Sequence, residues 1–175
     1  MKADPERLKQ KIRSIPDFPR PGVDFKDITP LLADAESYVP VVDAMVDRYR
    51  DRRVDKVCGI EARGFILAAP VAYRLGVGFV PIRKHGKLPY LSEAAAYTLE
   101  YSEEILEIHS DAVASGDRVL IVDDVLATGG TASASAELVQ RLGGVVAGIC
   151  CLIELEFLGG RAKVEEFDFY SLVRY

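Results

Sequence analysis

Residues 119–131 read Val119-Leu120-Ile121-Val122-Asp123-Asp124-Val125-Leu126-Ala127-Thr128-Gly129-Gly130-Thr131, an order of residue types that indicates a strand, a loop and the start of a helix. Four apolar residues are typical of a buried strand, and two adjacent acids follow at its expected end. A small-residue loop before a helix presents free backbone N–H groups to one point, which suits a phosphate. Carboxylates repel phosphate, but they accept hydrogen bonds from sugar hydroxyls. The segment therefore predicts a pocket for a sugar phosphate.

Two better-known phosphate-binding loops do not fit this segment. A Walker-type loop requires a lysine before its Ser or Thr, and here Gly130 precedes Thr131. The dinucleotide fingerprint has three spaced glycines and an acid about 20 residues later, whereas these acids precede the loop. An ordinary alternative is a buried strand that ends in a polar turn and a capped helix. The combination of acids, glycines and threonines in one block favours the functional interpretation.

Apolar runs alternate with helical patterns along the rest of the chain. Strands are predicted over 54–60, 77–82, 119–122 and 145–153, and helices over 40–50, 63–75 and 132–142, with a short helix that begins at Asp4-Pro5. The segments 97–101 and 105–109 predict an antiparallel pair, 167–172 predicts an edge strand, and the proline-rich segment 15–30 predicts an ordered irregular arm. This order predicts an α/β fold in a single domain, residues 1–175, with a central parallel sheet flanked by helices.

Polar residues from distant parts of the chain are expected to meet at one edge of this sheet. Glu61, Arg83 and Asp123 each follow a predicted strand. Ligands of open parallel sheets bind beyond the carboxyl ends of the strands. The pattern therefore predicts that two acids and a basic residue line one site.

Composition narrows the classes of protein. The chain has 175 residues, 49% of them hydrophobic, and a net charge of −5 that argues against a nucleic-acid partner. No apolar run approaches the roughly 18 residues that span a membrane, and the first residues lack a signal-peptide core. The three cysteines, Cys58, Cys150 and Cys151, lie in apolar runs and are expected to be structural thiols in a reducing compartment. We therefore expect a cytoplasmic protein without a membrane partner.

The segment 119–131 resembles the binding motif for 5-phosphoribosyl diphosphate (PRPP) in the type I phosphoribosyltransferase family. Segments 18–30, 60–65, 83–89 and 99–101 resemble the adenine branch of that family, and the similarity runs from about residue 12 to the C-terminus. The resemblance implies a Rossmann-like fold with an N-terminal hood over about 1–33 and a mobile catalytic loop over about 84–103. It also implies Mg²⁺-dependent transfer of 5-phosphoribose from PRPP to adenine, which gives AMP and diphosphate, by a homodimer.

The resemblance assigns roles to particular residues of this chain. The 5′-phosphate is expected to bind Ala127, Thr128, Gly129, Gly130 and Thr131, and the ribose diol Asp123 and Asp124. The diphosphate is expected to bind Glu61, Ala62, Arg63, Arg83, Lys84 and Lys87, and adenine Asp24, Phe25 and Lys26. Glu100, Tyr101 and Arg63 are the expected catalytic residues. No protein ligand for Mg²⁺ is assigned, because diphosphate, sugar hydroxyls and water are expected to supply its ligands.

Several of these residues have plainer alternatives. Phe25 could stack on a purine or anchor the arm in the core, and Glu100 could point outward from a strand. Arg63 would start a helix, where a positive charge is unfavourable, and this favours a functional role. Lys26 keeps a charge but lacks the planar surface of an arginine. The basic run 83–87 could be a solvated face; within it His85 is expected to be exposed, and His109 is expected to be structural.

Two other functions remain open at the level of sequence. The enzyme could use another base, such as hypoxanthine, guanine or xanthine, because the PRPP motif does not read the base. The fold could also serve a PRPP-sensing regulator, although such proteins carry an added DNA-binding segment and a basic surface, which this acidic chain lacks. The Glu100-Tyr101 pair favours an enzyme.

Overall fold

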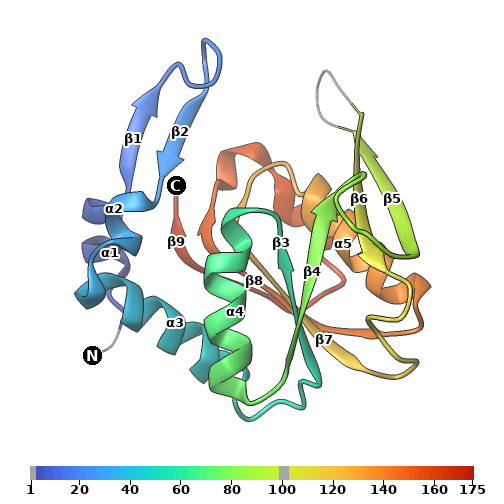
Figure 1. Ribbon diagram of the computed structural model, residues 1–175. Coiled ribbons are helices and arrows are strands. Elements are labelled where there is room, and N and C mark those ends of the chain that lie inside the picture. Colours follow the sequence, from blue (N-terminus) through green and yellow to red (C-terminus); the bar gives the residue numbers. More distant parts are fainter. Residues whose placement is uncertain (1–2, 99–102) are drawn as a thin grey trace.

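The computed structural model describes residues 3–98 and 103–175, which form a seven-stranded sheet and a separate two-stranded sheet (Figure 1). The strand order of the large sheet is β5-β6-β4-β3-β7-β8-β9. Its strands are β3 (Lys56–Ile60), β4 (Gly78–Lys84), β5 (Ser92–Thr98), β6 (Glu103–His109), β7 (Arg118–Leu126), β8 (Val145–Glu154) and β9 (Phe169–Arg174). The helices are α1 (Pro5–Lys11), α2 (Thr29–Leu32), α3 (Ala35–Tyr49), α4 (Arg63–Leu75) and α5 (Gly130–Arg141), with short 3₁₀ turns η1 (Glu156–Leu158) and η2 (Gly160–Val164).

The large sheet is mostly parallel, as predicted. β4, β3, β7, β8 and β9 pair in parallel, and β5 and β6 add an antiparallel edge beside β4. The sequence of β7 explains its central place, because Val119, Leu120, Ile121 and Val122 are all fully buried. A strand that is covered on both faces reads as a continuous apolar run. The predicted α/β fold class is therefore confirmed.

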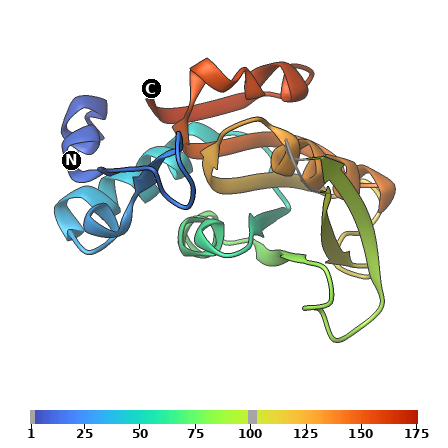
Figure 2. The same ribbon diagram turned by 90° about the horizontal axis from the view of Figure 1, so that it is seen from above.

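Helices cover both faces of the sheet (Figure 2). Apolar residues of α3 and α4 pack with one face of the strands in one core cluster, and those of α5 pack with the other face in a second cluster. α4 has the predicted bounds and ends at Gly76 with a φ of +72°, a left-handed conformation that favours glycine. α3 begins a turn earlier than predicted, because the side chain of Asp34 caps it.

The N-terminal arm is not irregular, and that prediction was wrong. β1 (Arg13–Pro16) and β2 (Asp24–Asp27) form an antiparallel hairpin, in which Ile15 pairs with Phe25. Pro19 and Pro21 fall in the connection between the strands, where no ladder hydrogen bond is lost. The hairpin projects at the end of the molecule where β4 ends (Figure 1).

The acid pair lies inside β7 rather than after it, which corrects the predicted strand end. Pairing of β7 with β3 stops at Val122, whereas pairing with β8 continues to Leu126. Beyond Val122 the side of β7 that faces β3 has no strand partner. The structure thus places Asp123 and Asp124 beside an open edge while β8 still holds the backbone.

The predicted mobile loop contains regular structure. β5 pairs with β6, and Ala95 is buried in the cluster that contains α5. Arg141 of α5 donates a hydrogen bond to the carbonyl of Ala94 at 2.6 Å. Movement of this segment stays a prediction, and residues 99–102 lie outside the described part of the chain.

Candidate active site

The loop between β7 and α5 lines a concave pocket of about 140 Å³. Asp123 and residues 125–132 form its wall. Gly129 is the N-cap of α5 with a φ of +79°, and no side chain caps this helix. The first N–H groups of an α-helix have no acceptor within the helix, so they remain available to an anion. The pocket therefore has the backbone donors that a phosphate needs.

Asp123 and Asp124 are buried next to this pocket. Asp123 Oδ1 accepts a hydrogen bond from the Asp124 backbone N–H at 2.9 Å. The nearest positive charge is Arg63, whose Nη2 lies 2.8 Å from Asp124 Oδ2. The direction of this contact does not make a hydrogen bond, and among the described residues Oδ2 has no hydrogen-bond donor.

Keeping Asp123 and Asp124 ionised costs free energy, because both are buried. Burial raises the pKa of Asp123, and the charge of Asp124 raises it further. Burial also raises the pKa of Asp124, while Arg63 acts in the opposite direction. A hydroxyl donor bound to these oxygens would favour their charged form. The pair is therefore suited to bind a diol.

Helix α4 starts in contact with the acid pair because its second residue is glycine. A Cβ on Gly64 would lie 2.7 Å from Asp123 Oδ1 and 3.1 Å from the carbonyl oxygen of Val122. The N-cap is Ala62, which supplies no side-chain hydrogen bond, and the peptide bond between Glu61 and Ala62 is cis. A second uncapped helix N-terminus thus lies at the same edge.

Glu61 accepts hydrogen bonds from several residues of the basic run 83–87. Its Oε2 accepts hydrogen bonds from Arg83 Nε at 3.2 Å and from the Lys84 backbone N–H at 3.0 Å, and its Oε1 accepts one from Lys87 Nζ. Burial would raise the pKa of Glu61, but hydrogen bonds from Lys87, Lys84 and Arg83 outweigh burial and lower it. Arg83 and Lys87 are therefore held beside the start of α4.

The other members of the run 83–87 face β6. Lys84 Nζ lies 2.9 Å from Glu104 Oε2, and His85 Nδ1 lies 2.7 Å from Glu107 Oε1. Glu107 also accepts a hydrogen bond from the backbone N–H of Gly86 at 2.9 Å. The side chain of His85 is 69% exposed, in agreement with its predicted exposure. Of the three predicted diphosphate contacts in this run, Lys84 thus points its ammonium group away from Glu61.

Phe25 of the hairpin connects to the acid pair through Arg63. The guanidinium carbon of Arg63 lies 4.8 Å from the centroid of the Phe25 ring, and Phe18 packs edge-on against that ring at 5.2 Å. Arg63 Nη1 also donates to the carbonyl of Lys26 at 3.4 Å. The hairpin is therefore joined to the same site as α4 and β7.

Asp24 and Lys26 are engaged within the arm. Lys26 Nζ lies 2.8 Å from Asp24 Oδ2 and 2.9 Å from Ser14 Oγ, and it lies over the ring of Tyr175. The hydrogen bond from Lys26 is the largest cause of the lowered pKa of Asp24. Of the three predicted adenine contacts, Phe25 contacts Arg63 through its side chain and Lys26 contacts it through its backbone carbonyl. The predicted catalytic residues Glu100 and Tyr101 lie outside the described residues.

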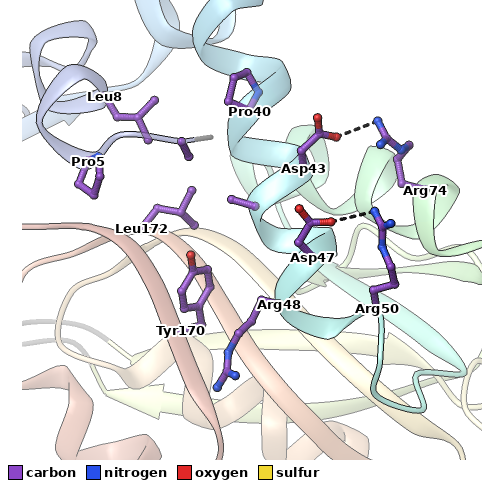
Figure 3. Close-up of a pocket in the computed structure, with 12 residues that line it drawn as sticks. Pro5, Leu8, Pro40, Asp43, Asp47, Arg48, Arg50, Arg74, Tyr170 and Leu172 are labelled. Carbon is purple, nitrogen blue, oxygen red and sulfur yellow. Dashed lines mark ion pairs between the residues drawn. The ribbon is translucent and has the colours of Figure 1, made fainter. Parts of the chain in front are cut away.

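A larger hollow, of about 850 Å³, lies elsewhere, between α1, α3 and β9 (Figure 3). Four charged side chains along its wall form pairs with each other, Asp43 with Arg74 and Asp47 with Arg50, each at 2.8 Å, and Arg48 pairs with Asp168 outside the wall. It contains none of the residues predicted to bind substrate. Volume alone therefore does not identify the active site of this chain.

Sequence reasoning missed several residues that shape the site. Gly64 allows α4 to approach β7, Glu107 holds the turn at Gly86, and Tyr175 covers Lys26. The glycine immediately after Arg63 was a usable signal, because a glycine at a helix start permits close approach of a ligand or another backbone. No local pattern indicates the contact between Lys26 and the C-terminal Tyr175.

Comparison with known proteins gives a consistent result. The profile of the phosphoribosyl transferase domain family matches residues 31–173. Adenine phosphoribosyltransferase of Desulfitobacterium hafniense is 55% identical over 164 residues, which cover 94% of this chain and 95% of the relative. The crystal structure of adenine phosphoribosyltransferase from Thermoanaerobacter pseudethanolicus has a TM-score of 0.95 and 52% identity, and covers 98% of this chain and 100% of that chain.

A more distant structure carries ligands. Adenine phosphoribosyltransferase from Trypanosoma brucei, in complex with AMP, pyrophosphate and ribose-5-phosphate, has a TM-score of 0.89 and 26% identity. The match covers 97% of this chain and 78% of that chain.

Proposed function

This chain belongs to the phosphoribosyltransferase family, with adenine phosphoribosyltransferases as its relatives, and on that premise we propose that it transfers the 5-phosphoribosyl group of PRPP to adenine. The products are AMP and diphosphate, so the reaction salvages a purine base. One observation carries the proposal: two adjacent buried carboxylates lie beside a loop that ends in an uncapped helix N-terminus. A ribose 5-phosphate offers a diol to the first group and an anion to the second.

The substrate is placed by matching its charges to the described contacts. We place the 5′-phosphate in the pocket lined by residues 127–131 and the ribose diol on Asp123 and Asp124. The diphosphate then lies at the start of α4, within reach of Arg63, Arg83 and Lys87. Arg83 and Lys87 are preferred to Lys84, because both pair with Glu61 beside that helix start.

The base is placed on the hairpin side of Arg63. Phe25 supplies a flat apolar ring in contact with the guanidinium of Arg63, which in turn reaches Asp124. A purine attached to C1′ of the bound ribose would extend toward this aromatic and cationic pair. Asp24 and Lys26 support the hairpin through their mutual ion pair and Ser14.

Mg²⁺ fits this site as an ion that arrives with PRPP. Among the described residues, no group of three or more His, Cys, Asp and Glu side chains could hold a metal ion on its own. Asp124 Oδ2 remains open to an additional donor or cation, and hard oxygen ligands suit Mg²⁺. When bound, the ion neutralises negative charge on the diphosphate.

The chemical step breaks the bond between C1′ and the diphosphate oxygen, and the electron pair leaves with that oxygen. The purine nitrogen forms the new bond to C1′ and gives its proton to Glu100, the proposed general base, so the protein needs no covalent intermediate. Positive charge develops on the ribose as the bond breaks, as in other glycosyl transfers. Arg63, Arg83 and Lys87 stabilise the departing anion, and closure of the loop over about 84–103 excludes water.

Glu100 is the proposed acid/base for the purine nitrogens, with Tyr101 beside it. Glu100→Gln keeps the size of the side chain and removes its ability to take a proton. We expect kcat to fall about 100-fold, within the usual range for general acid–base catalysis, with less than a twofold change in the KM for PRPP. Steady-state kinetics measures both constants, and an unchanged kcat would assign the proton transfer to another group.

We also propose that the chain forms a homodimer in the cytoplasm. Ile66 and Tyr73 of α4 and Phe79 of β4 are 44%, 84% and 38% exposed, and a dimer interface would cover such apolar side chains. Light scattering after gel filtration measures the molar mass, and Tyr73→Glu is expected to shift it toward the monomer. The three cysteines are buried free thiols, which supports a reducing compartment. No helix among the described residues is long and apolar enough to cross a membrane.

The decisive test is a base-by-base assay with PRPP and Mg²⁺ that measures nucleotide and diphosphate formation. Adenine is expected to give AMP with a kcat/KM far above that for hypoxanthine, guanine or xanthine. Preference for another base would assign the chain to a different branch of the family. Binding of PRPP without any product from any base would indicate a PRPP sensor.

A further inference from the structure

The phosphate-binding loop, residues 127–131, rests on a segment that the proposed reaction does not use. A Cβ on Gly160 would lie 2.1 Å from the carbonyl oxygen of Ala127 and 2.7 Å from the backbone nitrogen of Gly129. Conversely, a Cβ on Gly129 would lie 2.4 Å from the carbonyl oxygen of Gly160. The two backbones therefore touch, and Gly160 is buried between them and the rest of η2.

An ion pair with a buried carboxylate fixes the position of Gly160. The next residue, Arg161, donates two hydrogen bonds to Glu154, from Nε to Oε1 and from Nη2 to Oε2, each at 3.0 Å. Ser171 of β9 donates to the same Oε2 at 2.7 Å, and the side chain of Glu154 is only 4% exposed. A fork of this kind fixes direction as well as distance. The backbone at Gly160 is thereby tied to the end of β8 and to β9.

The same residues also join the phosphate-binding loop to β8. Glu154 pairs with Leu126, the last residue of β7, and the Leu155 N–H donates to the carbonyl of Leu126 at 2.9 Å. The guanidinium of Arg161 also lies 4.1 Å from the centroid of the Phe169 ring, which adds a contact with β9. β8 thus holds the start of the loop, and Gly160 contacts the loop backbone at Ala127 and Gly129.

We propose that Gly160 and the Glu154–Arg161–Ser171 cluster are positioning residues for the 5′-phosphate of the substrate. None of them is placed in contact with substrate; they set where the N–H groups of the phosphate-binding loop point. This inference rests on the proposed function for the identity of the phosphate. Donors that bind an anion must be fixed in place before it arrives, and a misplacement of about 1 Å can cost about 100-fold in rate.

Gly160→Ala and Arg161→Met test the proposal in the full-length protein. Both are expected to raise the KM for PRPP and the Kd for ribose 5-phosphate about tenfold or more, while the KM for adenine changes less than about twofold. Arg161→Lys keeps the charge and loses the fork, so we expect partial recovery of both constants. Ser171→Ala removes one hydrogen bond and provides a mild variant if Gly160→Ala does not fold.

Asp168→Asn is the matched control. Asp168 immediately precedes β9, and its carboxylate pairs with Arg48 at 2.6 Å and Arg52 at 2.8 Å rather than with the Glu154–Arg161–Ser171 cluster. We expect this variant to lower the melting temperature without changing the KM for PRPP or the Kd for ribose 5-phosphate. An equal rise of both constants in the control, or parental constants in Gly160→Ala and Arg161→Met, would overturn the proposal. Failure of the parent to form AMP would instead count against the proposed function, because binding of ribose 5-phosphate is measured separately.

Discussion

Asp124 shows how a single residue links burial to the proposed binding of substrate in this protein. Its side chain is 7% exposed, lies next to a second carboxylate, and contacts one arginine, Arg63. Burial raises the pKa of both acids, so their charge opposes folding. Because the buried charge destabilises the fold, we expect Asp124 to contribute to ligand binding and not to stability. Its substitution should therefore change binding and stability in different ways.

Asp124→Asn is the prediction at this scale. Loss of a charged acceptor for a sugar hydroxyl is expected to cost about 2 kcal/mol, or about 30-fold in kcat/KM for PRPP. The melting temperature should stay the same or rise, because a buried charge is removed. Kinetics together with thermal denaturation measures both effects.

Asp43→Asn is the control for this variant. Asp43 Oδ1 is also buried, contacts Arg74 and lacks a hydrogen-bond donor among the described residues, but it lies in the hollow beside α3. We expect its kcat/KM to remain parental. Equal losses in the two variants would contradict a specific role for Asp124.

At the scale of elements, the site depends on the approach of α4 to β7. Gly64 makes this approach possible, and the end of pairing between β3 and β7 at Val122 leaves room for a ligand. Two uncapped helix starts, those of α4 and α5, then belong to one site, whereas α1 and α3 are capped by Asp4 and Asp34. The helices that begin at the site thus leave their first N–H groups for a ligand.

Gly64→Ala tests this packing. The added methyl group would overlap Asp123 Oδ1, so we expect a loss of about 1–3 kcal/mol in unfolding free energy and a large fall in kcat/KM for PRPP. Gly78→Ala is the control, because a Cβ there meets only Lys56 Cγ at 4.0 Å, and we expect a stability change within about 0.5 kcal/mol. Urea denaturation and kinetics distinguish the two variants. A fully active Gly64→Ala protein would show that α4 can approach β7 in another way.

At the scale of the whole molecule, carboxylates whose pKa is lowered in the folded state set the stability toward acid. Hydrogen bonds lower the pKa of Asp27, Asp34, Asp55 and Asp117 below the ordinary value of 3.8, with the Thr29 hydroxyl, Lys11, the Arg118 N–H and the Ala114 N–H as the largest causes. A group whose pKa is lower in the folded state stabilises the fold above its unfolded pKa. That contribution is lost as the pH falls from about 4 through the folded pKa.

We therefore expect the free energy of unfolding to decrease as the pH is lowered from about 4.5 toward 2. The raised pKa values of Asp123 and Asp124 act with the opposite sign, since protonation relieves the burial of their charge, but they are two groups against the four with lowered pKa values. Urea denaturation at a series of pH values measures the slope. Asp117→Asn should flatten it, because this variant removes one of the lowered carboxylates, and a slope of zero in the parent would contradict the expectation.

The sequence was sufficient to predict the features that depend on the local pattern of residues. The bounds of α4 followed from the apolar stripe between Arg63 and Gly76, and the central place of β7 followed from its apolar run. The hairpin β1–β2 was missed because its prolines hid a strand pair whose turn contains two of them. The contact of Gly160 with Ala127 joins residues far apart in the chain, and no spacing rule could have indicated it.

The candidate site also has a part that the sequence predicted and a part that depends on the tertiary fold. The motif over residues 119–131 predicted the pocket, because its chemistry is contained in one stretch. The partners of the basic residues depend on the tertiary fold: Glu61 faces Arg83 and Lys87, whereas Glu104 takes Lys84. A run of charged residues in a sequence shows which groups are present. The pairing of strands in the sheet determines the direction in which each side chain points.

The central claim is that the loop after β7 binds the sugar phosphate while the acid pair binds its diol. Isothermal titration calorimetry with PRPP and Mg²⁺ tests it most directly. We expect saturable binding with one site per chain in the parent protein, and much weaker binding in Asp124→Asn at equal folded content. Absence of heat and of thermal protection at saturating PRPP, or parental affinity in Asp124→Asn, would contradict the account.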